Sequence, residues 1–489
     1  MQKYLFPASI ILLFAYRFLH FGNIIDDPHA WRQYDTLVYI LDYYKNSINM
    51  LRPSVCWMGS YKTLLLEFPL YEAIVAILYR VFGESLVWAR LVSLAFFAGA
   101  CFYFYKITKK LFNKSIAEYS TILFTAMPLS LYYSRAIQID FMVLFFSLAM
   151  LWYILMGYIN FNLRYYLLGI TFASLAFVCK APIAFCLLFP ILAYILSNNK
   201  INIAFKWSLY WLIPLFLTIY WISYSKSINE QAPDWNKIIP GFHNFTKMNH
   251  WYYGTMAQRL DWKNWDTIIN RIYHEILGGK FGTFLLFIGI FTVKSFNNRW
   301  FLWIWILGTI IYLNIFFNLN LHHNYYQISF LAPSALSLGI SIHFIQTLLE
   351  KKINKFNVAF YIPYIVLIIL VSSYIKIAEK DYYKEDKISN EIAFRISQNT
   401  PEDAIIINSF DWQDKFCPLI LAPARRYGWS VPHFLLNSNV VHSLKKEGAS
   451  FLALTIKKEN LPDSALIKKE YILVKKEEFE GWNFYLYKI

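Results

Sequence analysis

The sequence predicts a polytopic α-helical membrane protein that ends in a small soluble α/β domain. Hydrophobic residues make up 57% of the 489 positions and charged residues only 16%, whereas a soluble domain carries roughly 25% charged residues on its wetted surface. Apolar runs of about 20 residues, the length that crosses a bilayer, recur along most of the chain. After residue 376 the sequence becomes rich in Lys and Glu, with short β-like runs at 405–408, 451–455, 471–476 and 484–489.

Eleven apolar segments are counted as membrane spans. The first is interpreted as an uncleaved helix, because no small-residue cleavage pattern follows it. The spans cover residues 4–21, 86–108, 116–134, 139–157, 165–179, 183–197, 204–224, 281–294, 300–319, 325–347 and 357–376. The apolar segment 64–83 is ambiguous, and including it gives the alternative of twelve spans and inverts every later helix.

Loop charge favours the count of eleven. With the amino terminus inside and 64–83 left out, the cytoplasmic connections carry most of the cationic residues found in the short loops, as the positive-inside rule requires. These residues are Lys3, Lys106, Lys109, Lys110, Lys114, Arg164, Lys200, Lys206, Lys294, Arg299, Lys351, Lys352 and Lys355. The short outer connections hold only Arg135 and Lys180. The sequence therefore predicts a multi-pass protein of the cell inner (plasma) membrane, with its amino terminus in the cytoplasm.

Two domains and two long outer loops follow from this topology. A transmembrane domain is expected over 1–376, with outer loops 22–85 and 225–280, and an extracytoplasmic α/β domain over 377–489. The first outer loop is expected to hold two amphipathic helices, near 33–48 and 69–83, that rest in the headgroup plane with a polar stripe beside an apolar face.

A helical hairpin is expected around Cys179-Lys180-Ala181-Pro182. The flanking spans 165–179 and 183–197 are together too long for one crossing at about 1.5 Å per residue. Pro182 suits a tight turn, which places Lys180 at the outer end of the hairpin.

The net charge of +15 does not indicate a nucleic-acid partner. The basic residues lie in short loops between apolar spans, where they act as topology signals and contacts for anionic lipids. The membrane is therefore the expected partner of this charge, and no nucleic acid is expected.

Titratable residues cluster directly after the first span, in the segment Asp26-Asp27-Pro28-His29-Ala30-Trp31-Arg32-Gln33-Tyr34-Asp35. A carboxylate at the membrane–water boundary can accept a proton from an incoming hydroxyl. A nearby arginine, lysine or histidine can hold a phosphate. From the clustering alone, an ordinary polar loop in which Asp26 and Asp27 cap a turn is an equally good interpretation.

Seven short motifs follow one another along the chain. They are His29-Ala-Trp-Arg-Gln-Tyr-Asp-Thr36, Glu67-Phe-Pro-Leu-Tyr71, Ala89-Arg-Leu-Val-Ser93, Lys109-Lys-Leu-Phe112, Tyr133-Ser-Arg-Ala-Ile-Gln-Ile-Asp140, Lys180-Ala-Pro182 and His323-Asn-Tyr-Tyr-Gln327. In this order and spacing the chain resembles the GT-C class of membrane glycosyltransferases. It is most similar to relatives of protein O-mannosyltransferases and lipid A aminoarabinose transferases, which are bacterial glycosyltransferase family 39-like.

The resemblance implies roles for particular residues. A first-loop carboxylate is implied as the base, with Asp27 as the first choice and Asp26, Asp35 and Glu67 as alternatives. Substrate binding is implied for His29, Arg32, Arg135, Asp140, Lys180, His323 and Tyr325. Without the resemblance, Asp140 is interpreted as a helix cap, and Lys180 equally well as a phosphate ligand or a snorkelling lysine. His323 and Tyr325 favour hydrogen bonding to a phosphate or a sugar, with interfacial anchoring as the alternative.

The function that the resemblance implies is transfer of a hexose or pentose from a polyprenyl-phosphate donor to a hydroxyl of a glycan, lipid or protein acceptor. The transfer is expected at the outer face, with inversion at the anomeric carbon. No cofactor and no metal are expected. Two alternatives stay open: a non-catalytic lipid or solute transporter, which would carry charges near the bilayer midplane, and a glycan polymerase or ligase that uses a diphosphate-linked glycan.

Overall fold

The computed structural model describes residues 2–242, 249–352, 356–410, 414–459 and 471–489; Lys355 and part of the second long loop fall outside these ranges. Contacts divide the chain into two compact units. The helical unit comprises Met1–Asn23, Ser85–Ile222 and Asn249–Tyr383, and the mixed unit comprises Ile24–Glu84, Ser223–Met248 and Lys384–Ile489. The boundary between the helical unit and the carboxyl-terminal part of the mixed unit thus falls after Tyr383. Parts of both long loops group with the carboxyl-terminal residues. These units do not correspond to the two predicted domains, so the predicted domain boundary at 376 stays a prediction.

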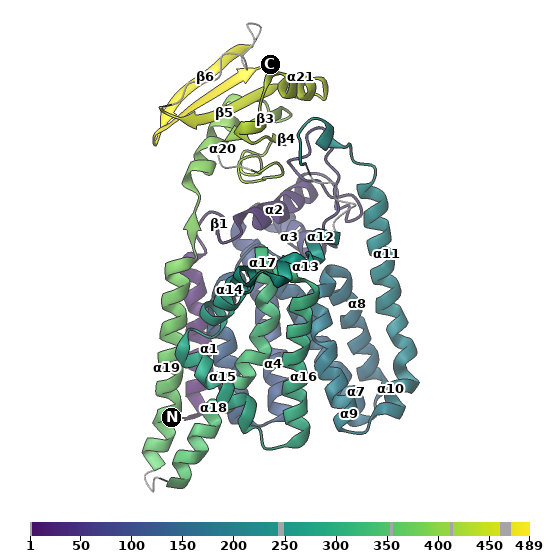
Figure 1. The fold of residues 1–489 in the computed structure, drawn as a ribbon, viewed down its shortest axis with the longest axis vertical. Helices are drawn as coiled ribbons and strands as arrows, with labels where there is room; N and C mark the ends of the chain where they lie inside the picture. The colour runs from purple at the N-terminus through teal and green to yellow at the C-terminus, as the bar shows by residue number, and fades with distance from the viewer. Residues whose placement is uncertain (1, 243–248, 353–355, 411–413, 460–470) are drawn as a thin grey trace. The chain divides into compact units, whose positions relative to one another are not determined.

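The helical unit consists of α-helices whose long members lie side by side in Figure 1. Its helices are α1 (Gln2–Arg17), α4 (Leu86–Leu111), α5 (Lys114–Ala126), α6 (Pro128–Tyr133), α7 (Asp140–Asn160), α8 (Leu163–Cys186), α9 (Leu188–Ser197), α10 (Ile201–Trp207), α11 (Leu212–Asn229), α12 (Asn249–Tyr253), α13 (Met256–Leu260), α14 (Trp262–Arg271), α15 (Lys280–Thr292), α16 (Phe296–Ile315), α17 (Phe317–His322), α18 (Leu331–Lys352) and α19 (Phe356–Asp381).

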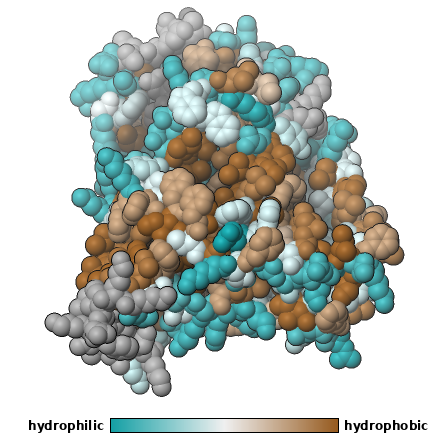
Figure 2. All heavy atoms as spheres, turned by 60° about the horizontal axis from the view of Figure 1, so that its bottom comes forward, coloured by the Kyte–Doolittle hydropathy of each residue, from teal (hydrophilic) through white to brown (hydrophobic). Residues whose placement is uncertain are grey.

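The long helices suit a bilayer. Within the described ranges, six helical segments are long and apolar enough to cross a membrane, or seven if the pair Trp262–Ile276 and Lys280–Thr292, bent by 89°, forms one span. Large hydrophobic side chains on α11, α15 and α19, among them Phe216, Phe287 and Ile368, are exposed as lipid-facing residues are. Figure 2 shows hydrophobic residues over a broad middle part of the surface, with hydrophilic residues in both the upper and the lower parts of the view. Several of the eleven predicted spans are short or broken helices, which length and composition alone do not identify as membrane-crossing. The count of eleven spans therefore stays a prediction.

The connections between helices gather at two ends of the helical unit. At one end, which we call the basic end, Lys110, Ile159, Asn198 and Asn297 from four different connections line one pocket. At the opposite end, the Arg90 guanidinium donates to the carbonyl oxygens of Phe21 (2.5 Å) and Asn23 (2.7 Å). The chain therefore leaves and re-enters the helical unit at the same end around residues 24–84, which agrees with leaving 64–83 out of the span count.

The predicted hairpin is present inside α8. Its backbone breaks at Lys180 (φ −161°, ψ 82°), and the Lys180 ammonium lies 2.8 Å from Asp140 at the first residue of α7. Asn198, just after α9, lines the same pocket as Ile159 near the last residue of α7. The chain therefore turns at Lys180 and runs back to the basic end, so the prediction of a turn at this residue is confirmed.

A second break separates α5 from α6, and Arg17 donates hydrogen bonds to backbone carbonyl oxygens on both sides of it. A helix end leaves backbone carbonyl oxygens without intrahelical partners. The buried Arg17 guanidinium donates to the carbonyl oxygens of Thr125 (2.7 Å) and Ser130 (3.2 Å) and to the Ser134 hydroxyl (2.6 Å). The last residue of α1 therefore joins the first helix to the interior of the bundle.

The mixed unit contains a five-stranded sheet with helices, as the predicted α/β domain requires. Its elements are β1 (Asp26–Asp27), α2 (Ala30–Lys45), α3 (Leu70–Phe82), β2 (Lys384–Glu385), α20 (Lys387–Asn399), β3 (Ile405–Phe410), β4 (Tyr427–Ser430), α21 (Ser438–Lys446), β5 (Phe451–Lys457), β6 (Ile472–Phe479) and β7 (Trp482–Lys488). The strand order is β4-β3-β5-β7-β6. β3 is parallel to β4 and β5, while β7 is antiparallel to β5 and β6.

Part of the first long loop extends this sheet at the β4 edge. The Gly59 N–H donates to the Gly428 carbonyl (2.7 Å), and the Gly428 N–H donates to the Cys56 carbonyl (2.8 Å). Gly59 has φ +66°, and a Cβ there would lie 1.8 Å from the Trp429 ring. Only glycine fits this position, because both the left-handed backbone and the indole exclude a side chain.

The two predicted loop helices are present, and they differ in how they are buried. On α3, Glu72 and Tyr79 are buried while Ile77 and Val81 are 51% and 67% exposed, so an apolar face is left open as expected for an interfacial helix. α2 is buried continuously from Gln33 to Ile40. The prediction that α2 rests on the membrane surface is therefore wrong. Its polar face is buried like its apolar face, because α3 and the carboxyl-terminal residues of the same unit cover it.

Candidate functional site

Five charged side chains are buried in the described part of the helical unit, and all lie at helix ends opposite the basic end. Arg17 closes α1, Arg90 lies near the start of α4, Arg135 follows α6, Asp140 opens α7 and Lys180 forms the hairpin turn. Transporters carry functional charges near helix centres. The distribution seen here instead resembles a site that opens at one face of a membrane.

Lys180 and Asp140 form a buried ion pair lined by aromatic rings. Their side chains are 3% and 2% exposed, and the Nζ–Oδ1 distance is 2.8 Å. The ammonium also lies 4.7 Å and 4.5 Å from the ring centroids of Tyr325 and Tyr326, within cation–π range. The second oxygen of Asp140 is buried and accepts no hydrogen bond from the described residues. The pair therefore holds the ammonium in a fixed place, and the hydrogen-bonding capacity that stays unused among the described residues belongs to one oxygen of Asp140.

A polar network continues from this pair toward the end of α19. The Tyr133 hydroxyl donates to the Asn324 side-chain oxygen. The Asn324 amide and the Tyr382 hydroxyl both donate to the Glu275 carboxylate, at 2.7 Å and 2.8 Å. Glu275 belongs to a π-helical turn, Ile272–Ile276, a feature that is frequent at functional sites.

Arg135 lies between aromatic rings in the same region. Its guanidinium carbon is 4.7 Å from the Tyr383 centroid and 5.4 Å from that of Tyr132. The nearby Gln138 is 2% exposed, and its side-chain nitrogen and oxygen have no hydrogen-bond partner among the described residues. Each such unpaired buried group costs about 1–3 kcal/mol unless a ligand or water pairs with it.

The histidine pair lies on the aromatic side of this cluster. His323 is 5.0 Å from Tyr325 between ring centroids, and His322 stacks on Trp251 at 5.5 Å. The Arg271 guanidinium donates to the Leu321 carbonyl beside them at 2.7 Å. Across the residues that could be searched, no group of three histidine, cysteine or carboxylate side chains is arranged to hold a metal.

The acids of the first loop belong to the mixed unit. Asp26 and Asp27 form β1, which pairs with β2, so that Asp27 lies opposite Lys384. The Asp27 carboxylate accepts a hydrogen bond from the Ala30 N–H at 3.1 Å and so caps α2. Asp27 stays open to solvent, yet partial burial, reinforced by the charges of Asp386 and Asp26, raises its pKa.

The other candidate acids are more enclosed. Asp26 is 1% exposed. Asp35 accepts a hydrogen bond from the Trp57 indole at 2.9 Å, and burial raises the pKa of Asp35 to about 6. Glu67 forms an ion pair with Arg32. Of the four candidate acids, Asp27 is therefore the exposed one, and it forms no ion pair among the described residues, although the charge of the neighbouring Lys384 acts to lower its pKa.

The predicted residues thus fall into two groups. Asp140, Lys180, Tyr325 and His323 lie together in the helical unit, with Arg135 among neighbouring tyrosines. The mixed unit holds Asp26, Asp27, Asp35, His29, Arg32 and Glu67, where His29 has a left-handed backbone (φ 63°) just before α2. A site shared by both groups stays a prediction. Tyr133, Gln138 and Asn324 lie within the motifs quoted above but were assigned no role, and Glu275 was missed because a single acid in the second long loop forms no pattern that marks it.

Sequence and structure comparisons agree on one class of protein. Residues 67–224 match the model of a family described as dolichyl-phosphate-mannose-protein mannosyltransferase. No curated protein matches the sequence. Arg135, Asp140 and Lys180 all lie inside the matched range.

Two solved membrane proteins share the fold. ArnT from Cupriavidus metallidurans bound to undecaprenyl phosphate matches with a TM-score of 0.62 and 13% identity, covering 99% of this chain and 97% of ArnT. The Archaeoglobus fulgidus oligosaccharyltransferase in its apo form matches with a TM-score of 0.59 and 13% identity, covering 92% and 70%. The same enzyme tethered to an acceptor peptide gives 0.57. The chain is therefore a multi-pass membrane protein with the fold of GT-C glycosyltransferases, and the resemblance read from its sequence is confirmed.

Proposed function

We propose that this protein is a glycosyltransferase that moves a sugar from a polyprenyl-phosphate donor to an acceptor hydroxyl. The observation that carries the proposal is the buried Lys180–Asp140 pair, which lies among tyrosines at the end of the helical unit where all its buried charges gather. The similar ArnT structure holds undecaprenyl phosphate, and the similar oligosaccharyltransferase was tethered to an acceptor peptide. Both observations support a lipid-linked donor and a glycan, lipid or protein acceptor.

The donor phosphate is assigned to the cationic cluster. Asp140 accepts a hydrogen bond from the Lys180 ammonium and so fixes the position of this positive charge. Lysine binds phosphate as a compact charge, and arginine adds a planar pair of donors. Lys180 and Arg135, with His323 and Tyr325, would stabilise the charge that develops on the departing lipid phosphate. Preorganised charge of this kind supplies a large part of the rate in many enzymes.

The base is assigned to Asp27. The acceptor oxygen attacks the anomeric carbon, its proton passes to the Asp27 carboxylate, and the bond from that carbon to the phosphate oxygen breaks with its electron pair on the phosphate. One displacement inverts the anomeric carbon. A raised pKa makes a carboxylate a better proton acceptor, and the accessible Asp27 has that property. Asp26, Asp35 and Glu67 are the alternatives, and His29 and Arg32 are assigned to substrate binding beside them.

The reaction is proposed to need no metal or other cofactor, and to take a hexose or a pentose. It is proposed at the outer face of the inner (plasma) membrane, with the amino terminus in the cytoplasm. Removal of divalent ions by EDTA should leave the initial rate of transfer unchanged, and a rate lost with EDTA and restored by a divalent ion would contradict this part of the proposal.

The test is transfer of radiolabel from polyprenyl-phosphate sugars by the purified full-length chain in the presence of membrane extract. Asp27→Asn should lower the rate by about 10²–10⁴, the usual contribution of a general base. The asparagine side-chain oxygen still accepts the Ala30 N–H bond, so the substitution removes the charge and keeps the helix cap.

Asp42→Asn is the matched control. Asp42 is also on α2, and its carboxylate accepts only a local bond from Asn46 at 2.8 Å in the described structure. Its rate should stay near that of the wild type. Full turnover by the Asp27 variant would exclude Asp27 as the base, and no labelled product with any donor would favour a transporter over an enzyme.

A further inference from the structure

Two pockets lie beside the contact between α9 and α16, away from the proposed reaction site, and neighbouring residues line them: Ser197 and Phe296 in one, Asn198 and Asn297 in the other. One is apolar and the other is polar. Asn198 and Asn297 meet between them, with the Asn297 amide donating to the Asn198 oxygen at 3.1 Å. Neither pocket contains a residue of the catalytic proposal.

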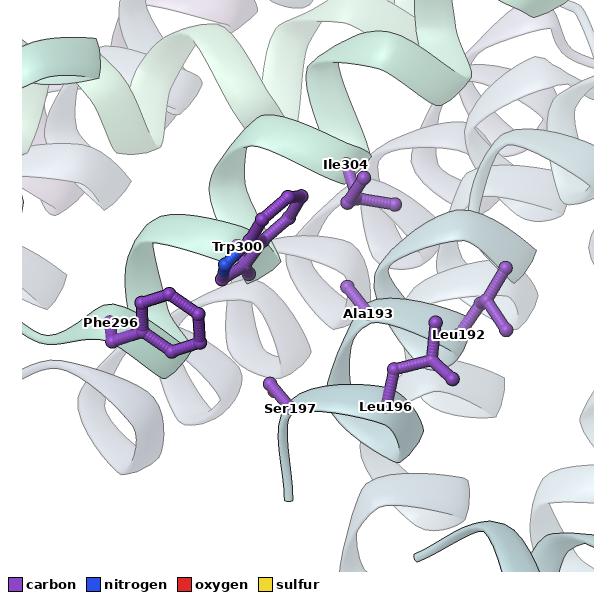
Figure 3. Close-up of a pocket in the computed structure, with 7 residues that line it drawn as sticks. All are labelled: Leu192, Ala193, Leu196, Ser197, Phe296, Trp300 and Ile304. Atoms are coloured by element: carbon purple, nitrogen blue, oxygen red, sulfur yellow. The ribbon is translucent and has the colours of Figure 1, made fainter. Parts of the chain in front are cut away.

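The apolar pocket is a groove of about 300 Å³. Figure 3 shows Phe296, Trp300 and Ile304 of α16 facing Leu192, Ala193, Leu196 and Ser197 of α9 across it. Leu196 and Phe296 are 56% and 64% exposed. A groove of this length and composition accepts a hydrocarbon chain, because filling it removes apolar surface from contact with anything more polar.

The polar pocket has about 320 Å³ and a different lining. Its lining residues are Lys110, Leu111, Ile159, Tyr194, Asn198, Ser295, Asn297, Asn298 and Phe301. One cation, three amides and two hydroxyls are among these lining residues, and no acid is. Lys200 lies at the same end, with its ammonium 3.9 Å from the Phe161 ring. Basic pockets between helices at the cytoplasmic side of membrane proteins suit anionic headgroups.

We propose that the two pockets together bind one anionic phospholipid. Its phosphate headgroup lies in the polar pocket against Lys110 and the second N–H of the Asn297 and Asn298 amides, each of which uses one N–H within the protein. One acyl chain passes Ser197 and Phe296 into the apolar groove. Because Lys110 gives the polar pocket a positive charge and no acid lines it, an anionic lipid is favoured over a zwitterionic one. Because the pocket joins the ends of α4, α7, α9 and α16, the bound lipid would stabilise their packing. This proposal does not depend on the enzymatic one.

The test is native mass spectrometry of the delipidated full-length chain with added phosphatidylglycerol or phosphatidylcholine of identical acyl chains. One phosphatidylglycerol should remain bound, at about fivefold higher occupancy than phosphatidylcholine. Lys110→Gln should lower its occupancy about fivefold, as expected for one lysine at an anionic surface, and Lys110→Arg should retain it. Lys109→Gln is the control, because Lys109 lies over the Tyr105 ring at 5.6 Å and does not line the pocket.

The groove is tested separately. Leu196→Gln should weaken retention of both lipids, whereas Leu212→Gln, an equally exposed leucine on α11, should not. Equal retention of the two lipids, or equal effects of Lys110→Gln and Lys109→Gln, would overturn the headgroup assignment. Equal effects of the two leucine variants would overturn the chain assignment.

Discussion

Lys180 and Asp140 are buried at the same place, and the ion pair alone does not distinguish a binding role from a structural one. Removing one partner of a buried pair leaves an uncompensated charge, which costs about 3–5 kcal/mol. Replacing both charges restores most of that loss, because neither remaining side chain then needs an ionic partner. A pair of variants therefore separates the two roles.

Lys180→Met should lower the free energy of unfolding by about 3–5 kcal/mol in detergent micelles. The double variant Lys180→Met with Asp140→Asn should recover most of this stability while transfer from the lipid-phosphate donor stays lost, since no ammonium remains to hold the phosphate. Denaturation curves and radiolabel transfer on the same preparations measure both quantities. Normal transfer by the double variant would show that the pair serves the fold alone.

Asp35 makes stability depend on pH. Burial raises its pKa to about 6, compared with about 3.9 in an unfolded chain. The folded chain therefore holds this proton more tightly, so the stabilisation is complete below pH about 4 and is lost as the pH rises to about 6. At about 1.4 kcal/mol for each pH unit between these values, the loss is about 3 kcal/mol.

Asp35→Asn should remove this dependence and still accept the Trp57 indole bond. Its stability relative to the wild type should rise by about 3 kcal/mol between pH 4 and pH 6.5, measured by denaturation at each pH. Glu72, whose pKa burial raises to about 7, is present in both proteins and so cancels. A constant difference across this range would contradict the assignment.

Arg32 shows how far single residues could be predicted. Its motif predicted a phosphate ligand, and Glu67 was a candidate base, yet the structure pairs the two side chains with each other. The two residues are 35 positions apart, so no periodic pattern reveals that they meet. Asp27 could be found from its place after the first span, but its role as the cap of α2 needed the backbone.

At the scale of elements, the loop around Gly59 is fixed by its fit against Trp429. Gly59→Ala should destabilise the mixed unit by about 2–5 kcal/mol, because it adds a left-handed backbone penalty of about 1–2 kcal/mol to overpacking of about 1–3 kcal/mol. Thermal unfolding followed by tryptophan fluorescence measures the change. Gly83→Ala is the control for added volume: nothing lies within 4 Å of a Cβ at Gly83, so only the strain of its own glycine-favouring backbone (φ 85°, ψ 162°) applies there.

The elements divide into those that pattern predicts and those that depend on tertiary contacts. The hairpin at Lys180 and the strands β3, β5, β6 and β7 followed from proline, span length and apolar runs. β4 did not, because Tyr427-Gly-Trp-Ser430 is too short and contains a glycine. The burial of α2 was also missed, since its polar residues find partners on segments far away in the sequence.

At the scale of the whole molecule, the predicted topology places the basic connections in the cytoplasm and the carboxyl-terminal domain outside, so the two should react differently with a reagent added outside the cell. In a variant without native cysteines, Lys200→Cys should resist an impermeant maleimide added outside intact cells, while Lys458→Cys should react. Permeabilised cells, in which both positions should react, provide the control. Labelling of Lys200→Cys from outside would reverse the proposed orientation and remove the outer-face reaction with it.

The fold class was predictable because apolar length and loop charge act over the whole chain. The division into units was less so, since residues 24–84 and 223–248 group with the carboxyl-terminal residues through contacts that span hundreds of positions. Specific pairs such as Tyr34 with Asn390, whose side chains meet at 3.1 Å, build this grouping. No local signal in the sequence marks them.

The hydrogen bonds that Arg17 donates across the break between α5 and α6 predict the effect of removing α1. A chain shortened to begin after residue 20 would keep most of its apolar spans, yet the Thr125 carbonyl oxygen would lose the hydrogen bond that Arg17 donates to it, and the Ser130 carbonyl would keep only the Ser134 N–H at 3.3 Å. Helix α1 is thus part of the packed bundle and does not serve only to attach the chain to the membrane. Fusion partners placed before it should be tolerated, whereas its deletion should collapse the neighbouring Arg135–Asp140 segment as well.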